Sequence, residues 1–241
     1  MNQVTDTMLN HVTHRIFDKN FEIDDRTIQT IIDCLKKAPT HINGQFYSVI
    51  VVRDLKKRKR LVELNPLNGH ILKSSVFLLF IADFNRSRII MESNDTQHDF
   101  GKNIDNLFVA GIDAGLAAMN AVNTIESLEL GCVIVGGVRY HAKETIQLFN
   151  LPKFTYPLFG LSIGKPLDNP TKSPRLPKAL NVFEENYNTI PSDFFNDYDQ
   201  LLIDSRVTQG SIWSESIFNY FENDTLKTVT KENLEAQGLL S

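Results

Sequence analysis

The residues Val76–Ile81 constrain the fold more than any other part of the sequence. They form a nearly all-apolar run, which predicts a central strand covered on both faces, because a strand with one face in water alternates apolar and polar residues. Further strands are predicted over residues 47–52, 130–135 and 157–164. The chain is therefore expected to build layers of helices around a sheet.

Helical periodicity separates these strands. A short helix is predicted over residues 2–10, and Asp24 or Asp25 caps a second helix that ends before Pro39. The longest predicted helix spans about residues 104–128 and is rich in alanine and glycine. Glycine costs about 1 kcal/mol relative to alanine inside a helix, so these small residues indicate close packing, either in the core or at a subunit interface.

Two polar stretches are interpreted as solvated. The basic run Lys56–Arg60 precedes a helical pattern and is read as a solvated helix face rather than a phosphate-binding patch. The polar residues from 86 to about 101 are predicted to be mobile. Without repeats or a clear linker, the sequence predicts one α+β domain over residues 1–241, with an extended C-terminal excursion from about residue 180.

Composition excludes several classes of protein. No run approaches the roughly 20 apolar residues of a membrane span, and the polar start lacks an export signal. The two cysteines are too few for a disulfide framework and lack metal-binding spacing, so we expect a reducing, cytoplasmic setting and no metal. The net charge of −4 argues against nucleic acid as a main partner. Any anion site must therefore be built locally.

A candidate anion site begins in the segment His11–Phe17. If this segment is extended, His11, Thr13 and Arg15 line one face and His14 the other. A guanidinium suits phosphate because its planar fork donates two parallel hydrogen bonds. The alternative interpretation of this segment is a solvated strand edge.

Two later features add to this candidate. Prolines stiffen the loop that carries Arg175, which reduces the entropy lost on binding. The pair Gly136-Gly137 ends a buried strand and allows backbone N–H groups to approach a planar ligand, although a simple turn has the same pattern.

Taken together, the elements resemble the nitroreductase family, and within it the NADPH nitroreductases and NADPH flavin reductases. The resemblance extends from about residue 6 to 215. The matching residues and segments are His11, Thr13, Arg15, Phe17, 82–86, 126–128, 134–137, 156–161 and 174–177.

The resemblance implies an α+β fold, whose central mixed, mostly antiparallel sheet is flanked by helices. It also implies an intertwined homodimer, in which residues of about 180–241 form an excursion around the partner subunit, and FMN bound non-covalently at the subunit interface. The implied cofactor-binding residues are His11, Thr13, Arg15, Lys172, Ser173 and Arg175 at the phosphate and ribityl groups, and Thr40, His41, Ile42, Asn68, Ile134, Val135, Gly136 and Gly137 at the flavin.

The implied activity is ping-pong hydride transfer from NADPH or NADH to nitroaromatics, quinones, flavins or similar small acceptors. Because the flavin carries the chemistry, no catalytic acid or base is assigned, and His41 and His70 are interpreted as packing or hydrogen-bonding residues. The alternatives are an NADPH-dependent FMN reductase, a disulfide or oxidative-stress reductase, and a flavin-binding sensor or storage protein.

This sequence departs from the family pattern at four places. Val12 replaces an arginine, Ser173 a lysine, and Thr40–Asn43 a serine-rich loop. These changes predict weaker FMN retention than in a typical member. In the stretch 208–213 glutamine stands at the main arginine position, so the choice between NADPH and NADH stays open, with Arg139 and Arg206 as further cations.

Overall fold

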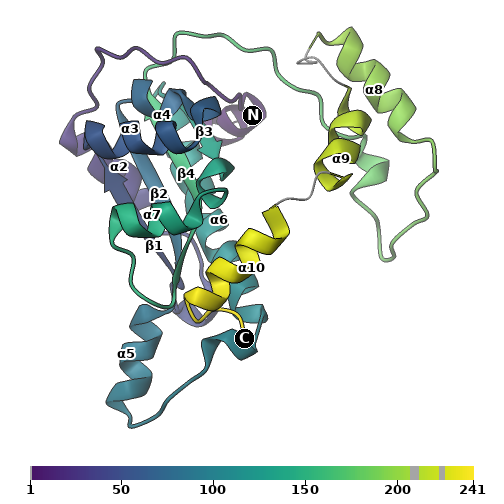
Figure 1. Ribbon diagram of the computed structural model, residues 1–241. Helices are drawn as coiled ribbons and strands as arrows, with labels where there is room; N and C mark the ends of the chain where they lie inside the picture. The colour runs from purple at the N-terminus through teal and green to yellow at the C-terminus, as the bar shows by residue number, and fades with distance from the viewer. Residues whose placement is uncertain (1, 207–211, 223–225) are drawn as a thin grey trace. The chain divides into compact units, whose positions relative to one another are not determined.

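A four-stranded antiparallel sheet is the centre of the fold (Figure 1). The computed structural model describes residues 2–206, 212–222 and 226–241. The strands β1 (Tyr47–Val52), β2 (Val76–Asp83), β3 (Gly131–Val135) and β4 (Thr155–Gly164) lie in the order β1-β2-β4-β3. Each neighbouring pair is antiparallel. The predicted α+β class and all four predicted strands are confirmed.

The apolar run identified in the sequence occupies an inner strand. All residues of β2 from Val76 to Ala82 are buried, and β2 pairs with β1 on one side and β4 on the other. Helices cover both faces of this strand, which is the physical reason why the alternation of a half-solvated strand is missing.

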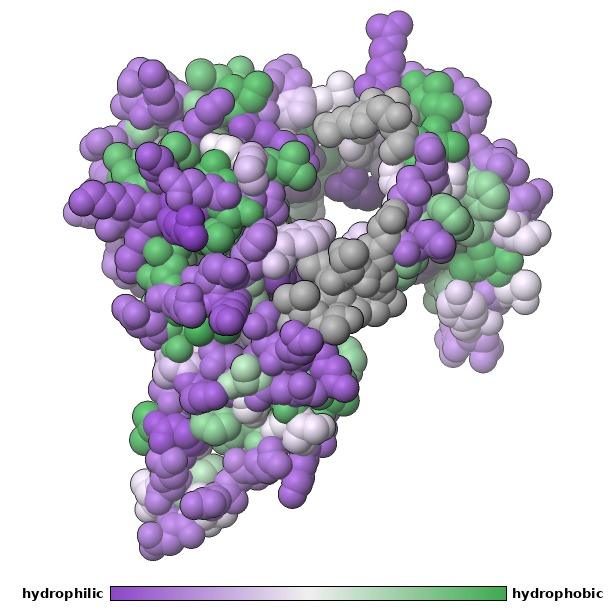
Figure 2. Space-filling model, in the orientation of Figure 1, coloured by the Kyte–Doolittle hydropathy of each residue, from purple (hydrophilic) through white to green (hydrophobic). Residues whose placement is uncertain are grey.

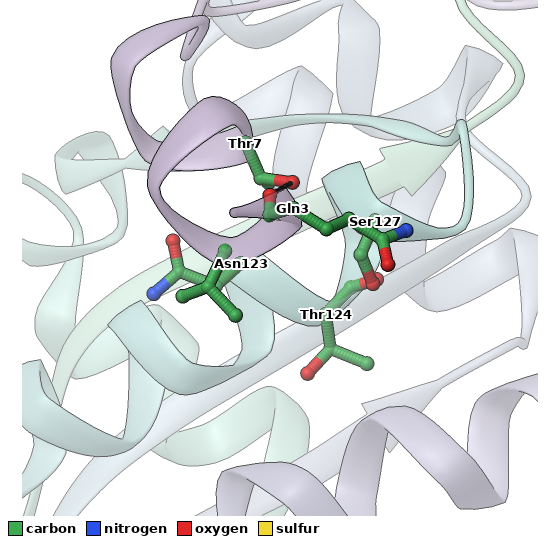
Figure 3. Close-up of a pocket in the computed structure, with 6 residues that line it drawn as sticks. Gln3, Thr7, Asn123, Thr124 and Ser127 are labelled. Carbon is green, nitrogen blue, oxygen red and sulfur yellow. Dashed lines mark hydrogen bonds between the residues drawn. The ribbon is translucent and has the colours of Figure 1, made fainter. Parts of the chain in front are cut away.

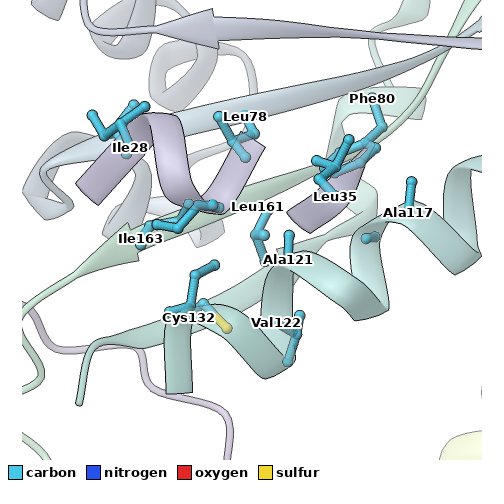
Figure 4. Close-up of a cluster of buried hydrophobic side chains, with 14 of the residues drawn as sticks. Ile28, Leu35, Leu78, Phe80, Ala117, Ala121, Val122, Cys132, Leu161 and Ile163 are labelled. Carbon is cyan, nitrogen blue, oxygen red and sulfur yellow. The ribbon is translucent and has the colours of Figure 1, made fainter. Parts of the chain in front are cut away.

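Two helices cover one face of the sheet. They are α2 (Asp25–Leu35), whose N-cap Asp24 accepts a hydrogen bond from the Thr27 N–H, and α6 (Asp105–Ser127). Their apolar residues pack with strand residues in one buried cluster (Figure 4). The labelled members are Ile28, Leu35, Leu78, Phe80, Ala117, Ala121, Val122, Cys132, Leu161 and Ile163.

The opposite face carries α3 (Leu55–Leu64), α4 (His70–Lys73) and α7 (Ala142–Phe149). Their buried side chains pack with Phe77, Leu79 and Ile81 of β2 in a second cluster. The sheet is thus the middle of three layers. Strand residues of odd and even number contribute to different clusters, as the pleat of a strand requires.

The helix α6 has two different faces. Its alanines Ala110, Ala114, Ala117, Ala118 and Ala121 are buried. At Gly111 and Gly115, by contrast, an added Cβ would meet nothing within 4 Å among the described residues. The alanines explain packing onto the sheet, whereas the glycines lie on a side that the described part of the chain leaves open. By length and apolar composition α6 also meets the criteria for a membrane span, but 44% of that window is buried inside the protein.

One interpretation of a polar stretch needs correction, and another polar stretch contains a helix that was not predicted. The basic run is not a uniformly solvated face, because Arg58 is only 5% exposed and donates to the backbone carbonyls of Ile71 and Ser74. The stretch predicted to be mobile begins with a helix, α5 (Asn85–Ser93). Periodicity did not reveal this helix because none of its residues is buried.

Hydrophilic residues predominate on the surface shown in Figure 2.

The chain divides into two compact units. The first contains Met1–Leu9, Thr13–Asp168 and Leu226–Ser241, and therefore α1 (Gln3–Leu9) and α10 (Leu226–Ala236). The final residues return to this unit, where the Phe154 N–H donates to the Gln237 carbonyl at 2.8 Å. The second unit contains Asn10–Val12 and Asn169–Thr225. The separate C-terminal segment therefore ends near residue 225.

The second unit is organised by α8 (Phe195–Asp204) and α9 (Trp213–Glu222). The Tyr198 ring lies edge-on to Trp213, with ring centroids 5.3 Å apart, and the Tyr198 hydroxyl donates to the Pro174 carbonyl at 2.9 Å. The Asp199 carboxylate accepts from the Ser214 N–H at 3.1 Å. The proline-rich loop next to Arg175 is thus held by α8. That the two units form one domain and wrap around a partner stays a prediction.

Candidate functional site

The segment His11–Phe17 is held in place by one carboxylate. The two oxygens of Asp168 accept hydrogen bonds from the His14 ring at 2.7 Å and the Arg15 N–H at 2.9 Å, and a longer one from the Ile16 N–H at 3.3 Å. Burial raises the pKa of Asp168, but these hydrogen bonds outweigh it, so the pKa lies below its usual value. Asp168 is therefore ionised at neutral pH.

The predicted alternation holds in the middle of this segment. His14 turns inward and lies against Gly131, where an added Cβ would approach the imidazole to 2.9 Å. Arg15 is exposed, and no described residue offers a hydrogen bond or ion pair to its guanidinium. Phe17 is buried, however, and forms an isolated bridge with Pro166, so the regular alternation ends after Arg15.

A histidine lies close to this arginine. Burial and then the positive charge of Arg15 lower the pKa of His70 from 6.5 to about 4. Its Nδ1 lies 3.3 Å from the Ser162 Oγ on β4. At neutral pH the imidazole is therefore uncharged, and Arg15 supplies the cationic charge at this position.

Asn68 and the glycine pair form a second contact on the same face of the sheet. Asn68 ends the 3₁₀ turn η2 (Pro66–Asn68), and the glycines open another, η4 (Gly136–Arg139). A Cβ on Gly137 would lie 2.3 Å from the Asn68 Nδ2 and 2.7 Å from the Asn65 Nδ2. Only glycine allows these amides to lie so close. The structure thus brings two predicted flavin-binding positions together.

The two strand residues before Gly136-Gly137 differ in the exposure of their side chains. Val135 is buried in the core, whereas Ile134 is 47% exposed. Ile134 is thus a solvent-accessible apolar side chain at the sheet edge, which suits contact with a planar ring.

The other predicted phosphate-binding residues belong to the second unit. They are the half-buried His11 and the exposed Lys172, Ser173 and Arg175. Lys172 donates to the side chain of Asn10, 162 residues earlier in the chain. Within this unit the residue just before the opening segment therefore contacts the proline-rich loop.

The loop with Thr40, His41 and Ile42 is backbone-strained. Ile42, Asn43 and Gln45 have φ angles of 47°, 56° and 51°, a region that costs a non-glycine residue roughly 1–3 kcal/mol. His41 and Ile42 are exposed, Ile42 by 80%. A conformation of this cost persists only where neighbouring contacts compensate for it.

The compensating contacts come from a buried carboxylate. Asp113 of α6 is 1% exposed, and its two oxygens accept from the His41 N–H at 2.9 Å and the Phe46 N–H at 3.1 Å. A hydrogen bond to a charged group contributes about 1.5–3 kcal/mol. Two of them offset a strain of several kcal/mol, so Asp113 accounts for the shape of the loop.

The predicted flavin-binding residues of the first unit thus fall into two groups. Thr13, Arg15, Asn68 and residues 134–137 gather along β3 and α4. The loop 40–42 leads into β1 and is attached to α6, on the other face. Since β2 and β4 separate β1 from β3, the two groups lie at opposite edges, about 14 Å apart by strand spacing.

Sequence reasoning missed the residues that support these groups. His14 was correctly placed on the opposite side of the segment but given no supporting role, and Asp168 and Asp113 were not singled out. An aspartate in the middle of an apolar helix such as α6 was a detectable signal, because an isolated charge is rarely buried without partners. No comparable signal marks Asp168.

A separate cavity of about 340 Å³ lies between α1 and the end of α6 (Figure 3). It is lined by Gln3, Val4, Thr7, Asn123, Thr124 and Ser127. None of the predicted cofactor-binding residues lines it, so it is not part of the candidate site.

Some predicted donor-binding residues can be placed. The Arg139 guanidinium donates to the Leu158 carbonyl at 2.6 Å, and Arg206 follows α8 with a φ of 53°. Of the stretch 208–213, residues 208–211, including Gln209, lie outside the described residues.

Comparison with known proteins identifies the class. The model of the nitroreductase family matches residues 8–67. An FMN reductase (NAD(P)H) of Bacillus subtilis (strain 168) is 35% identical over 246 residues, which cover 99% of this chain and 98% of that protein. An oxygen-insensitive NADPH nitroreductase of Salmonella typhimurium is 32% identical, covering 88% and 85%.

The fold agrees with this match. The structure of B. megaterium NfrA2 superimposes with a TM-score of 0.92 at 32% identity and covers 100% of this chain and 99% of its own. The chain belongs to the nitroreductase family, and it is an oxidoreductase. The family and the enzyme class expected from the sequence are confirmed.

Proposed function

We propose that the chain is an FMN-dependent oxidoreductase that passes two electrons from NADPH or NADH to nitroaromatics, quinones, flavins or similar small acceptors. The observation that carries this proposal is the guanidinium of Arg15. Its backbone is fixed by Asp168 while its side chain is exposed without a protein acceptor among the described residues. Relatives are described as an FMN reductase and an NADPH nitroreductase, and the phosphate of FMN is an anion that this cation could bind.

The residues of the first unit fit a flavin mononucleotide. Arg15 and the hydroxyl of Thr13, two residues earlier in the chain, match the charge and hydrogen-bonding capacity of a phosphate. The Asn68 amide suits the polar edge of a flavin ring, and the exposed Ile134 suits its apolar face. Contacts from His11, Lys172 and Arg175 of the second unit remain predictions of the sequence.

When bound, FMN supplies the two-electron chemistry between donor and acceptor. The protein residues bind and orient the reactants. Arg15 contributes a fixed charge at neutral pH, because a guanidinium does not lose its proton. The neutral His70 adds a polar group without adding charge. The backbone of Gly136 is open enough to donate an N–H to a ring atom that becomes negative as the flavin is reduced.

We also propose a homodimer as the working form. The open side of α6 presents Phe108, Ile112, Leu116 and Met119, which are 42–62% exposed, next to Gly111 and Gly115. An apolar helix face of this extent favours burial against another subunit. In a homodimer the loop 40–42 of one protomer can meet the β3 group of the other, which accounts for their separation within one chain.

An Ile112→Asp substitution tests the homodimer. It places a charge on the apolar face and is expected to convert a dimer into a monomer in light scattering after size exclusion. Ile89→Asp, at the 51% exposed Ile89 of α5, serves as the control. A wild-type protein that is monomeric at micromolar concentration contradicts the proposed dimer.

The activity is tested by anaerobic mixing of the FMN-loaded protein with NADPH. Bleaching of the flavin absorbance within seconds, followed by recovery when a quinone is added, is the expected result. A flavin band that persists after mixing contradicts turnover and favours a sensor or storage protein. The ratio of kcat/KM for NADPH and NADH then defines donor preference, and a panel of acceptors separates nitroreductase from flavin reductase or disulfide reductase activity.

FMN retention and cellular location are further parts of the proposal. The replacements at Val12, Ser173 and Thr40–Asn43 weaken retention, so FMN is expected to be lost during dialysis. Flavin that stays bound after dilution to nanomolar protein contradicts this expectation. We place the protein in the cytoplasm, and cell fractionation with immunoblotting tests that placement.

A further inference from the structure

The buried Asp113 and the ion-paired Arg86 determine the shape of the loop that contains His41 and Ile42. On its inner side the Asp113 carboxylate accepts from the His41 N–H and the Phe46 N–H, which bracket the left-handed residues Ile42, Asn43 and Gln45. One carboxylate thus joins the start of the loop to its end.

A guanidinium holds the exit of the same loop. Arg86 donates to the Gln45 carbonyl at 2.6 Å and the Tyr47 carbonyl at 2.9 Å, and it pairs with the Asp83 carboxylate at 2.8 Å. The loop therefore has an acceptor for its N–H groups on one side and a donor for its carbonyl groups on the other.

The interior of the loop is also closely packed. A Cβ on Gly44 would lie 2.4 Å from the Phe46 ring, so the chain must fold back tightly at this point. With both ends bound and the middle folded back, the backbone sets the direction of the exposed side chains of His41 and Ile42.

We infer that Asp113 is a positioning residue for cofactor binding, which sets the shape of the flavin-contacting loop before FMN arrives. This inference rests on the proposed function, because the loop contacts the flavin only if FMN is the cofactor. A carboxylate is required because it offers two acceptor oxygens. An asparagine offers one oxygen and directs an NH₂ group at the second backbone N–H.

The test compares Asp113→Asn with Asp54→Asn. Asp54 is a matched control, because its carboxylate also accepts from two backbone N–H groups, those of Lys56 and Lys57, at the start of α3. For Asp113→Asn we expect FMN Kd to rise at least 10-fold, and hydrogen exchange at the amides of residues 41–46 to accelerate at least 10-fold. For Asp54→Asn both quantities should change less than 2-fold.

Arg86→Lys provides a second variant if Asp113→Asn does not fold. Arg86 is 49% exposed, so its replacement leaves the core intact. It should raise FMN Kd several-fold and accelerate exchange at residues 45–47. Changes confined to the loop distinguish positioning from a general loss of stability, which accelerates exchange throughout the chain.

The possible outcomes distinguish a failure of the proposed function from a failure of the positioning role of Asp113. Wild-type protein that binds no FMN contradicts the proposed function. Wild-type protein that binds FMN, together with Asp113 and Arg86 variants that bind it equally well, overturns the positioning role alone. Unchanged exchange at residues 41–46 in Asp113→Asn overturns it as well.

Discussion

The contact between Gly137 and the amide of Asn68 allows a sharp prediction about the site. In a Gly137→Ala variant the new Cβ lies 2.3 Å from the Asn68 Nδ2 and 2.7 Å from the Asn65 Nδ2, whereas ordinary contacts begin near 3.4 Å. The Asn68 amide must therefore move by about 1 Å. A displacement of this size breaks any hydrogen bond that the amide makes to a ligand.

The size of the effect follows from the contacts involved. Loss of one neutral hydrogen bond costs about 0.5–1.5 kcal/mol, which raises FMN Kd about 2- to 10-fold. Overpacking costs roughly 1–3 kcal/mol, and the lower end applies because the obstructing atoms are side-chain ends. Neither Gly136 nor Gly137 has a positive φ. Alanine at either position therefore also raises the unfolding free energy by about 0.4–1 kcal/mol, because it reduces the conformational entropy of the unfolded chain. The net loss of unfolding free energy in Gly137→Ala is therefore at most about 0.6 kcal/mol relative to the wild type, and about 1 kcal/mol relative to Gly136→Ala, which gains the same stabilisation without the overpacking.

Gly136→Ala is the internal control for stability. Its Cβ would meet only Arg139, at 3.6 Å, so urea unfolding of the cofactor-free protein should show unchanged or slightly increased stability. In Gly137→Ala/Asn68→Ala the displaced amide is gone, and most of the lost stability should return while FMN affinity stays low. The reasoning is refuted if Gly137→Ala matches Gly136→Ala in stability and the wild type in FMN affinity by fluorescence titration.

Three further substitutions test the opening segment and its surroundings. Arg15→Ala should raise FMN Kd about 10- to 100-fold, because it removes charge-assisted hydrogen bonds of about 1.5–3 kcal/mol. Arg26→Ala, on the exposed side of α2, should leave FMN Kd unchanged. Equal FMN affinities of the Arg15→Ala variant and the wild type contradict the phosphate assignment. Asp168→Asn should lower the unfolding free energy by about 1–3 kcal/mol and weaken FMN binding, and a variant as stable as the wild type argues against its anchoring role. His70 has a lowered pKa of about 4, so the unfolded chain binds a proton that the folded chain does not, and stability is full above about pH 6.5 and falls as the pH drops towards 4. The lowered pKa of His70 corresponds to a loss of unfolding free energy of at most about 3 kcal/mol, and solvent screening of the half-buried ring reduces this to about 1.5 kcal/mol. Urea unfolding at several pH values should show this fall in stability in the wild type and a smaller one in His70→Gln.

Local patterns determined the elements of the fold. The apolar run at β2, the capped helix after Asp24 and the small-residue helix α6 were each predictable, because burial imposes a period on nearby residues. Where burial imposed no period, prediction failed. The helix α5 has no buried residue, and the burial of Arg58 depends on carbonyl groups of a different helix.

The predicted site shows the same division. Thr13, Arg15 and Gly137 were indicated by residue type and by resemblance, and their chemistry follows from the residue type alone. Their supports were not predictable, because Asp168 and Asp113 act on backbone N–H groups 152–153 and 67–72 residues away in the chain. Such pairs exist only after the sheet has brought distant segments together.

The sequence by itself thus determined the class of fold and the enzyme family, and it supplied the predicted cofactor-binding residues. The tertiary structure decided which of these residues share a face, which histidine is neutral and which carboxylates hold the strained backbone. The physical reason is that periodicity and residue chemistry are local properties. Desolvation, compensation of strain and the pairing of buried charges depend on neighbours that only the folded chain supplies.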